Sequence, residues 1–469
     1  MPKLLVNNRE IETSRPLGSP LVDFLRDELH LHGTRIGCRE GDCGACTVLV
    51  GDLVDGAVRY RAVASCLTPL GNVVGKHLVT IEGINQANLT TVQELFVEMN
   101  GTQCGFCTPG FILSVYGFCL GDKAFTLENA IDAVAGNVCR CTGYASIKRA
   151  LAAIVDRLQA MDRQAPMAWL TAHNFLPAYF LEIPKRLEGL GAPSRTEGGY
   201  ILAGGTDLLI QDFHGAQDAP RMELLSTREE LRRIRVQDGW CEIGAACTVS
   251  QLMESPELNA VVPGLEGYHG LIASHPIRNM GTVGGNLANA SPLGDLAVIL
   301  TGLGATLRLS KGGRIREMPL RKFFAGYKQT VLEPGEIIAG VEFEALDPRT
   351  RFSFEKSSKR RHLDMATVNS ALRITLEDGA EEPIVQKAIF AAGCLGPTVL
   401  HLKETSAFLV GRRLDAETFQ EANRIAQGEI SPISRHPGDG EYKRALLRQH
   451  LLIHLMKISP ETLGLEALA

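Results

Sequence analysis

Three cysteines lie within ten residues near the N-terminus, in the stretch GCREGDCGAC. Cys38, Cys43 and Cys46 have the spacing C-x4-C-x2-C, and Cys66 follows after nineteen further residues. This is the plant-type spacing for four thiolates that hold a [2Fe-2S] cluster. Glycines at positions 37, 41 and 44 would let backbone N–H groups approach the sulfurs. Zinc is the alternative, but structural zinc sites favour two C-x2-C pairs.

Four more cysteines form two close pairs further along the chain. They lie in QCGFCTPG and NVCRCTGY and are Cys104, Cys107, Cys139 and Cys141. Each pair precedes a predicted helix start, at Thr108-Pro109 and near Thr142, so two positive helix ends would face one anionic centre. Because C-x2-C is also common in zinc sites, the spacing alone leaves open a second [2Fe-2S] cluster, a zinc site or a redox C-x-x-C centre.

The remaining cysteines are predicted to be packed hydrophobic residues. Cys119 falls in an apolar helical run, and Cys241, Cys247 and Cys394 have no cysteine partner nearby in the sequence. Nine of the twelve cysteines lie in the first third of the chain. Such clustering indicates a local cause, and a disulfide framework is disfavoured because disulfide-rich domains are typically small and exported.

Length and charge restrict the function classes. A chain of 469 residues predicts roughly three domains, and 45% hydrophobic content suffices to fill their cores. The net charge of -5, without a long basic run, disfavours nucleic acid as a partner. The N-terminus MPKLLVNNREIE lacks the apolar core of a signal peptide, and no stretch approaches the roughly 18 apolar residues of a membrane span. We therefore expect a cytoplasmic protein.

Apolar periodicity predicts a mostly β segment at the N-terminus and a helical one after it. Strands are expected at residues 47–50 and 58–62, joined by a turn, with a helix at 22–31. A capping box at Thr91 and Glu94, and Thr108 as N-cap before an N1 proline, begin two further helices.

Helices at 126–135 and 144–161 complete an expected four-helix bundle. The later segments FSFEK, VNSALRITLE and AIFAAG read as strands, and terminal helices are expected from Asp415.

Two glycine-rich loops, at Ala203–Asp207 and Gly281–Asn286, are candidate phosphate sites. Consecutive glycines allow main-chain N–H groups to approach phosphate oxygens, and Thr206, Thr282 and Asn286 could add side-chain hydrogen bonds. The GxGxxG fingerprint is missing, so a Rossmann domain is not supported. By themselves, the loops do not establish a nucleotide site.

Taken in order with their flanks, the eight cysteines resemble the iron-sulfur half of the molybdenum hydroxylases, the xanthine dehydrogenase family. The matching motifs are GCREGDCGACTV, SCLTPL, GTQCGFCTPGF and GNVCRCTGY. The resemblance favours a [2Fe-2S] cluster at the second site also, and it covers nearly the whole chain. The stretches ILAGGTDL and GTVGGNLANASPLGD resemble the two flavin pyrophosphate loops of the family's FAD domain.

The resemblance implies site residues by position. The implied FAD contacts are Ile201, Leu202, Ala203, Gly204, Gly205, Thr206, Asp207, Leu208, Ile272, Thr282, Val283, Gly284, Gly285, Asn286, Asp295 and Thr367. Ile272 would lie beside the isoalloxazine, at a position where some relatives have Phe. Gln103 would approach the pterin of a molybdenum cofactor, and Cys141 would be the ligand nearest to it. No side chain of this chain is expected to act as a catalytic acid or base.

The resemblance also implies an α+β multidomain fold. Its expected parts are a β-grasp ferredoxin-like domain at 1–82, a helical [2Fe-2S] domain at 83–162, a linker at 163–170, a non-Rossmann FAD-binding domain at 171–342, and a C-terminal α+β subdomain at 343–469.

The implied function is that of the electron-transfer subunit of a xanthine dehydrogenase. A separate molybdopterin-binding large subunit would oxidise hypoxanthine and xanthine to urate, in a heterotetramer of two small and two large subunits. Electrons would pass through the helical-domain cluster, then the ferredoxin-like cluster, to FAD and NAD+. Tyr327 and the basic run Lys359 to Arg361 could lie near the flavin edge or the NAD site; a solvated loop is the other interpretation of the basic run.

Three alternatives remain open. The chain could serve a dehydrogenase of aldehydes, nicotinate or another N-heterocycle, since substrate choice would lie in the other subunit. It could be a stand-alone iron-sulfur flavoprotein electron carrier. A zinc-stabilised interaction protein is the third alternative.

Overall fold

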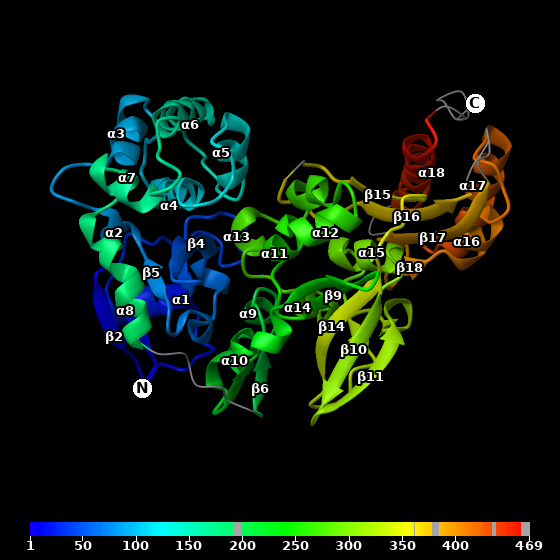
Figure 1. Ribbon diagram of the computed structural model, residues 1–469, viewed down its shortest axis with the longest axis horizontal. Coiled ribbons are helices and arrows are strands. Elements are labelled where there is room, and N and C mark those ends of the chain that lie inside the picture. The colour runs from blue at the N-terminus through cyan, green and yellow to red at the C-terminus, as the bar shows by residue number, and fades with distance from the viewer. Residues whose placement is uncertain (191–197, 361, 378–383, 434–437, 461–469) are drawn as a thin grey trace. The chain divides into compact units, whose positions relative to one another are not determined.

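The computed structural model describes residues 1–190, 198–360, 362–377, 384–433 and 438–460. Its contacts divide the chain into two compact units (Figure 1). The first unit holds Met1–Arg228 and Ser274–Gly281, and the second holds Glu229–Ala273 and Thr282–Ala469. The main chain therefore passes between the units three times. The expected division into five segments remains a prediction.

The N-terminal part of the first unit is a five-stranded sheet in the order β2-β1-β5-β3-β4. Its strands are β1 (Lys3–Val6), β2 (Arg9–Glu12), β3 (Thr47–Val54), β4 (Ala57–Ala64) and β5 (His77–Val79). Strands β1 and β5 pair in parallel, and the other pairs are antiparallel. Strands β3 and β4 are longer than predicted, because the two-residue turn Asp55-Gly56, with both φ angles positive, closes their hairpin.

The helix predicted at residues 22–31 is shorter and less regular. The structure has one helical turn, α1 (Leu21–Asp23), followed by a π-helical turn, η1 (Phe24–Glu28). Leu21, Val22 and Phe24 are fully buried against the sheet. The hydrophobic pattern predicted a helical segment, and the wider π-helical turn replaces most of the expected α-helix.

Four helices form the predicted bundle over a shared hydrophobic core. They are α3 (Thr91–Glu98), α4 (Thr108–Cys119), α5 (Leu127–Ala133) and α6 (Ala145–Leu158). The capping box of α3 is formed by Thr90 and Gln93, one residue before the predicted pair. At α4 the N-cap is Cys107, so Thr108 is already helical. Both predicted caps were wrong by one residue: at α3 the Thr90 side chain accepts from the Gln93 N–H, whereas at α4 no side chain caps the helix.

The rest of the first unit consists of short elements. They are α2 (Ile81–Ile84), α7 (Pro166–Ala172), α8 (Ile183–Leu190), the parallel pair β6 (Tyr200–Leu202) and β7 (Met222–Leu224), α9 (Leu208–Gln211), α10 (Phe213–Asp218) and α13 (His275–Arg278). Helix α7 begins inside the predicted linker, and its Leu170 is buried in the bundle core.

The second unit contains two main sheets. The first has the antiparallel order β11-β10-β14-β9-β8. Its strands are β8 (Ile234–Gln237), β9 (Trp240–Gly244), β10 (Thr306–Lys311), β11 (Arg314–Pro319) and β14 (Ile337–Glu344), with the small pair β12 (Phe324–Gly326) and β13 (Gln329–Thr330) nearby in sequence. The accompanying helices are α11 (Val249–Glu254), α12 (Pro256–Val261), α14 (Val283–Ala288) and α15 (Asp295–Gly302).

The second sheet has the antiparallel order β15-β16-β17-β18. Its elements are β15 (Thr350–Ser357), β16 (Val368–Leu376), β17 (Val385–Gly393), β18 (Leu400–His401), α16 (Lys403–Leu409), α17 (Ala416–Glu429) and α18 (Asp439–Ile458). The three strands and the terminal helices predicted here are present. None of the described helices is long and apolar enough to cross a membrane.

Successive residues of β16 face opposite sides of its sheet. Leu372 and Ile374 belong to the core that α16–α18 share, whereas Ala371 belongs to the core around α15. Because strand side chains alternate, Asn369 shares the face of Ala371 and Ser370 shares the face of Leu372. This alternation brings two different polar networks to the two faces of one strand.

A buried histidine pair lies on the α18 face of this sheet. The His450 ring contacts Ser357 Oγ at 2.8 Å and Ser370 Oγ at 3.0 Å, and His454 Nε2 lies 2.8 Å from Ser370 Oγ. Burial lowers the pKa of His450 to about 4. Burial also lowers the pKa of His454, which the charges of His450 and Lys457 lower further.

This network predicts loss of stability in mild acid. Histidine in the unfolded chain has a pKa of 6.5, so below this pH the unfolded chain binds a proton that folded His450 does not. The free energy of unfolding therefore decreases as the pH falls from 6.5 toward 4. His450 alone should contribute about 2 kcal/mol of loss between pH 7 and pH 5. Hydrogen exchange of α18 amides, corrected for intrinsic rates, measures the effect. His450→Gln should reduce this pH dependence and the exposed-residue control His30→Gln should not; equal pH dependence in both variants would contradict the assignment.

Candidate metal and flavin sites

The first four cysteines are brought together in two pairs. Cys38 and Cys43 lie in the loop before β3, Cys46 ends that loop, and Cys66 lies in the short turn after β4. The Cys43 thiol is within hydrogen-bond distance of Cys38, and Cys46 is within that distance of Cys66. Two thiolates for each of two irons is the ligand set that a [2Fe-2S] cluster requires.

The loop around these cysteines presents backbone N–H groups to sulfur. The Glu40 N–H donates to Cys38 Sγ over 3.3 Å. The hydrogen bond with Cys43, helped by backbone N–H groups, lowers the pKa of Cys38 to about 5 against the effect of burial. Gly41 has φ +77, and a Cβ there would approach Leu67 Cδ1 to 2.8 Å. Glycine is therefore required where this loop turns.

The second four cysteines also pair, as Cys104 with Cys141 and Cys107 with Cys139. The Cys104 and Cys141 sulfurs lie 3.6 Å apart. Two thiolates on one tetrahedral metal ion at about 2.3 Å would be separated by about 3.8 Å. The Thr142 hydroxyl donates to Cys139 Sγ over 3.1 Å. This arrangement fits two ligands to each of two irons.

The same pairing bears on the zinc alternative. At each site the four cysteine thiols come together as two pairs. A mononuclear structural zinc site needs four such ligands around one ion. The paired geometry therefore fits the two-iron cluster better at both sites.

The two cysteine loops are hydrogen-bonded to each other. Val138 N–H donates to the carbonyl of Cys43 over 2.9 Å. The buried Asn137 side chain donates to the Gly44 carbonyl over 2.9 Å, and its own oxygen accepts from Ser114 over 2.7 Å. One hydrogen bond thus connects ligand Cys43 to the residue before ligand Cys139. Sequence reasoning missed Asn137, whose only signal was a polar residue beside the NVCRC motif.

The two sites differ in exposure. Cys46 and Cys66 are buried, whereas Cys104 and Cys141 are exposed. Near the exposed pair in sequence, Phe106, Val138 and Tyr144 also remain exposed. Gln103 is exposed as well. Outside these sites, the pKa values of the remaining thiols are raised by burial, as expected of packed residues: Cys119, Cys241, Cys247 and Cys394.

The first glycine-rich loop follows β6 and lies in the first unit. Among the described residues, no protein acceptor is found for the N–H groups of Gly204, Gly205 and Thr206. A Cβ on Gly204 would come within 2.2 Å of the Met280 carbonyl, so the chain needs glycine there. Asn72 fixes the loop by donating to the Ala203 carbonyl over 2.8 Å. Three consecutive free donors in a tight loop fit phosphate oxygens.

The second glycine-rich loop, in the second unit, uses its N–H groups differently. Val283 donates to the Cys247 carbonyl over 2.9 Å, and Gly284 donates to the Ala245 carbonyl over 2.8 Å. Gly285 donates to the Thr282 hydroxyl, which caps α14. The argument from free glycine amides therefore fails for this loop, where Gly284 instead permits close packing against Ala245.

Asn286 supplies the polar group that the second loop leaves available. Its Oδ1 is buried and has no hydrogen-bond partner in the described part of the chain. A buried acceptor without a partner is costly, so a bound ligand that donates to it would remove the cost. The unpaired Asn286 oxygen is therefore consistent with a cofactor that binds at this loop and donates a hydrogen bond to it.

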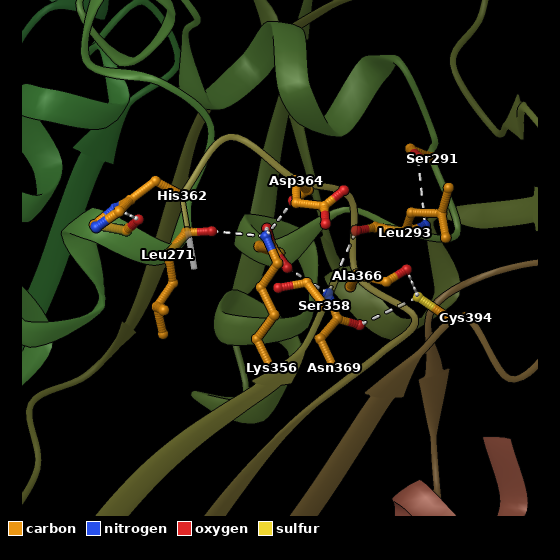
Figure 2. Close-up of polar contacts among 12 residues, drawn as sticks. Leu271, Ser291, Leu293, Lys356, Ser358, His362, Asp364, Ala366, Asn369 and Cys394 are labelled. Atoms are coloured by element: carbon orange, nitrogen blue, oxygen red, sulfur yellow. Dashed lines mark hydrogen bonds and ion pairs between the residues drawn. The ribbon is translucent and has the colours of Figure 1, made fainter. Parts of the chain in front are cut away.

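Three other predicted flavin contacts, Ile272, Asp295 and Thr367, lie in the second unit. Figure 2 shows the polar network that contains Lys356 and Asn369. Asp295 accepts from Lys356 over 2.7 Å and from Asn369 over 2.6 Å. Ile272 is 5% exposed, and the Thr367 N–H donates to the Ser357 carbonyl over 2.8 Å.

Burial raises the pKa of Asp295, and the Lys356 charge acts against that rise. Lys356 was not predicted from the sequence, since nothing local marks a lysine in FSFEK as buried. Of the residues expected near an acceptor site, Tyr327 is 60% exposed and Arg361 lies outside the described residues.

Comparison with known proteins adds domain matches that follow this layout. Residues 4–71 match a "2Fe-2S iron-sulfur cluster binding domain" and residues 80–152 a "[2Fe-2S] binding domain". Residues 184–343 match the "FAD binding domain in molybdopterin dehydrogenase", and residues 353–456 match the "CO dehydrogenase flavoprotein C-terminal domain".

Curated relatives match along most of this chain. Xanthine dehydrogenase 1 of Arabidopsis thaliana is 28% identical over 510 residues, which cover 91% of this chain and 37% of the relative. Aldehyde oxidase 1 of Oryctolagus cuniculus is 28% identical over 538 residues, covering 98% and 40%. The chain thus spans well under half the length of these relatives.

Solved structures match over little more than half of this chain. Carbon monoxide dehydrogenase from Hydrogenophaga pseudoflava, at 28% identity and a TM-score of 0.51, matches over 55% of this chain and 89% of its own. Reconstituted CO dehydrogenase from Oligotropha carboxidovorans gives 27% identity, a TM-score of 0.52, and 56% and 92% coverage.

Two [2Fe-2S] domains, an FAD-binding domain and a flavoprotein C-terminal domain define an iron-sulfur flavoprotein of the oxidoreductase class. The predicted α+β multidomain fold is confirmed. Along most of its length the chain is similar to proteins of the molybdenum hydroxylase family.

The cysteine pairing predicts which thiols hold iron. Cys139→Ser removes one ligand from the helical-domain site and should lower the iron content from about four to about two atoms per chain. Cys119→Ser makes the same chemical change at a buried cysteine outside both sites and should leave iron unchanged. Iron analysis and the visible spectrum measure both results. Retention of all iron by Cys139→Ser would contradict the ligand set.

The connection between the loops predicts a coupling effect. Asn137→Leu leaves the Gly44 carbonyl and the Ser114 hydroxyl without their partner, so stability should fall by about 1–3 kcal/mol while both clusters stay bound. Paramagnetic resonance of the reduced protein should show weaker spin coupling between the clusters. Asn88→Leu makes the same chemical change at an exposed position and is the matched control, which should change neither quantity. Full coupling in Asn137→Leu would exclude a positioning role for Asn137.

Proposed function

We propose that this chain is the electron-transfer component of a molybdenum-dependent dehydrogenase. In this role it accepts electrons from a molybdopterin centre on a partner polypeptide and delivers them through two [2Fe-2S] clusters to FAD and then to NAD+. When bound, the clusters carry single electrons, and FAD exchanges one or two. The chain's own residues ligate, position and bury these groups.

The hydrogen bond between Val138 and Cys43 is the observation that carries this proposal. It links the two ligand loops directly within the first unit, as a relay requires. On the far side of the ferredoxin-like site, the segment after Cys66 contacts the first flavin loop: a Cβ on Gly205 would meet Pro69 Cγ at 2.4 Å. This contact supports an order in which the helical-domain cluster receives electrons and the ferredoxin-like cluster passes them toward FAD.

We propose that the exposed ligands mark the side that receives electrons. Cys104 and Cys141 are exposed, and Phe106, Val138 and Tyr144 leave apolar surface near them in sequence. Exposed apolar groups beside a redox centre suit the docking of a protein partner. A molybdopterin-binding subunit would cover them, with Gln103 near its pterin, in an assembly of two small and two large subunits.

We propose FAD as the flavin and assign its binding to the residues predicted in the two loops. The support comes from each loop separately: the first offers the free N–H groups of Gly204–Thr206, and the second offers the orphaned Asn286 oxygen. Ile272, Asp295 and Thr367 complete the proposed contacts.

Xanthine and hypoxanthine are the proposed substrates of the assembly. The similarity to xanthine dehydrogenase 1 supports this assignment, but aldehyde oxidase 1 is equally similar at 28%. An aldehyde or N-heterocycle substrate is therefore the second candidate, and quinoline 2-oxidoreductase from Pseudomonas putida, at 25% identity, favours the heterocycle.

Metal and flavin analysis of the purified chain, followed by anaerobic titration, tests the proposal. We expect about four iron atoms and one FAD per chain, and reduction of both flavin and clusters by NADH. Zinc without iron would overturn the assignment, and flavin that NADH leaves oxidised would overturn NAD+ as the acceptor.

Assays of the copurified complex distinguish the substrates. Turnover of xanthine, but not of benzaldehyde or quinoline, is the expected result. Full activity of the isolated chain with a physiological donor, as a stable monomer, would instead establish a stand-alone electron carrier.

A further inference from the structure

A buried lysine joins three loops of the second unit. Lys356 lies at the end of β15, and its side chain is 2% exposed. Its Nζ lies 2.6 Å from the Leu271 carbonyl, 2.7 Å from Asp295 Oδ2 and 2.8 Å from the Asp364 carbonyl (Figure 2). An ammonium group has three N–H donors, and all three have acceptors here. A neutral amine has two N–H donors and would leave one of these three acceptors unmatched.

Strand register explains how the lysine reaches this position. Lys356 is paired directly with Asn369 across β15 and β16, so both side chains lie on the α15 face of the sheet. Asn369 donates to the other oxygen of Asp295 over 2.6 Å and to the Leu293 carbonyl over 3.3 Å. Asp295 is the first residue of α15, where the helix dipole favours negative charge.

Stability alone gives little reason for this pair. A buried ion pair often contributes no more than well-packed apolar residues of the same volume, because desolvation offsets the attraction. What apolar residues cannot supply is three directed donors at fixed angles. Lys356 bonds two main-chain carbonyls in addition to Asp295, so it fixes backbone as well as charge.

Each of the three loops carries a predicted flavin contact. Leu271 precedes Ile272, Asp295 is itself predicted, and Asp364 lies three residues before Thr367. The loops that flank Lys356 also contact each other, since His362 Nδ1 lies 3.0 Å from the Gly270 carbonyl. The lysine is therefore the common attachment of three irregular segments from distant parts of the sequence.

We propose that Lys356 is a positioning residue for the flavin: it holds the segments of Ile272, Asp295 and Thr367 in their binding arrangement. The inference rests on the proposed FAD function and extends it to a residue outside the predicted contacts. In this arrangement Asp295 acts mainly as the ion-pair partner of Lys356.

Variants of the full chain test the inference. Lys356→Met removes all three donors and should weaken FAD binding roughly 10- to 100-fold, the usual effect of losing an outer-shell partner. Iron content should be unchanged, because the cysteine ligands lie in the other unit. Lys356→Arg keeps the charge but changes the geometry of the donors. Its affinity for FAD should lie between those of the wild type and Lys356→Met. The control Lys457→Met removes an exposed lysine that pairs with Glu355 on the same strand, and should bind FAD normally.

Two measurements separate positioning from a general loss of stability. The FAD dissociation constant comes from titration of the deflavinated protein, and the flavin midpoint potential comes from reductive titration at a temperature where every variant is folded. A positioning role predicts that both change in Lys356→Met. The double variant Lys356→Met/Asp295→Asn leaves no unpaired buried charge. Because Asp295 is itself a proposed contact, the comparison is with Asp295→Asn alone, and the double variant should bind FAD more weakly than that single variant.

The possible failures are distinct. Wild-type FAD affinity in Lys356→Met, or a double variant that binds FAD as tightly as Asp295→Asn alone, would overturn the inference and leave the flavin assignment intact. If Lys356→Met does not fold, the double variant and Lys356→Arg decide by the same criteria. A wild-type chain that binds no FAD would overturn the proposed function itself.

Discussion

The contact between the two cysteine loops constrains the whole first unit. Cys43 and Val138 share one hydrogen bond, and Asn137 fills the remaining space against Gly44. A side chain on Gly44 would meet the Gly136 carbonyl at 2.4 Å, so even a methyl group would separate the loops. The sheet and the bundle must therefore present their loops at a fixed distance.

The polar groups at the sites have long-range partners. Asn137 bonds a carbonyl more than ninety residues earlier in the sequence, and Lys356 bonds residues from three separate segments. A buried polar group that lacks its hydrogen-bond partners costs folding free energy. When the partners are present, its hydrogen bonds fix their directions. Such groups define one arrangement of irregular loops, which apolar packing by itself leaves less well determined.

Local sequence rules predicted what depends on local structure. The structure places in pairs the cysteines that the spacing groups together, and their assignment as ligands stays a prediction. Helix positions followed from periodicity, but the caps of α3 and α4 were displaced by one residue; at α3 the adjacent Thr90 accepts the N–H hydrogen bond, and at α4 no side chain does.

Contacts between residues that are far apart in the sequence could not be predicted in this way. The amides at Val283 and Gly284 looked available, yet carbonyls near Cys247 accept their hydrogen bonds. Asn137 and Lys356 had no local signal, because their importance comes from residues that only the fold brings near.

The segment Ser274–Gly281 has a consequence for how such chains can be divided. It packs with the iron-sulfur unit, although both of its flanks belong to the other unit. Its buried Arg278 lies 3.7 Å from Asp132 of the helical bundle, and Asn279 donates to the Ala62 carbonyl over 2.9 Å. If the iron-sulfur and flavin modules were separate polypeptides, these intramolecular contacts would become a subunit interface. In such a split protein, the segment Ser274–Gly281 would form part of the surface by which the flavin subunit binds the iron-sulfur subunit.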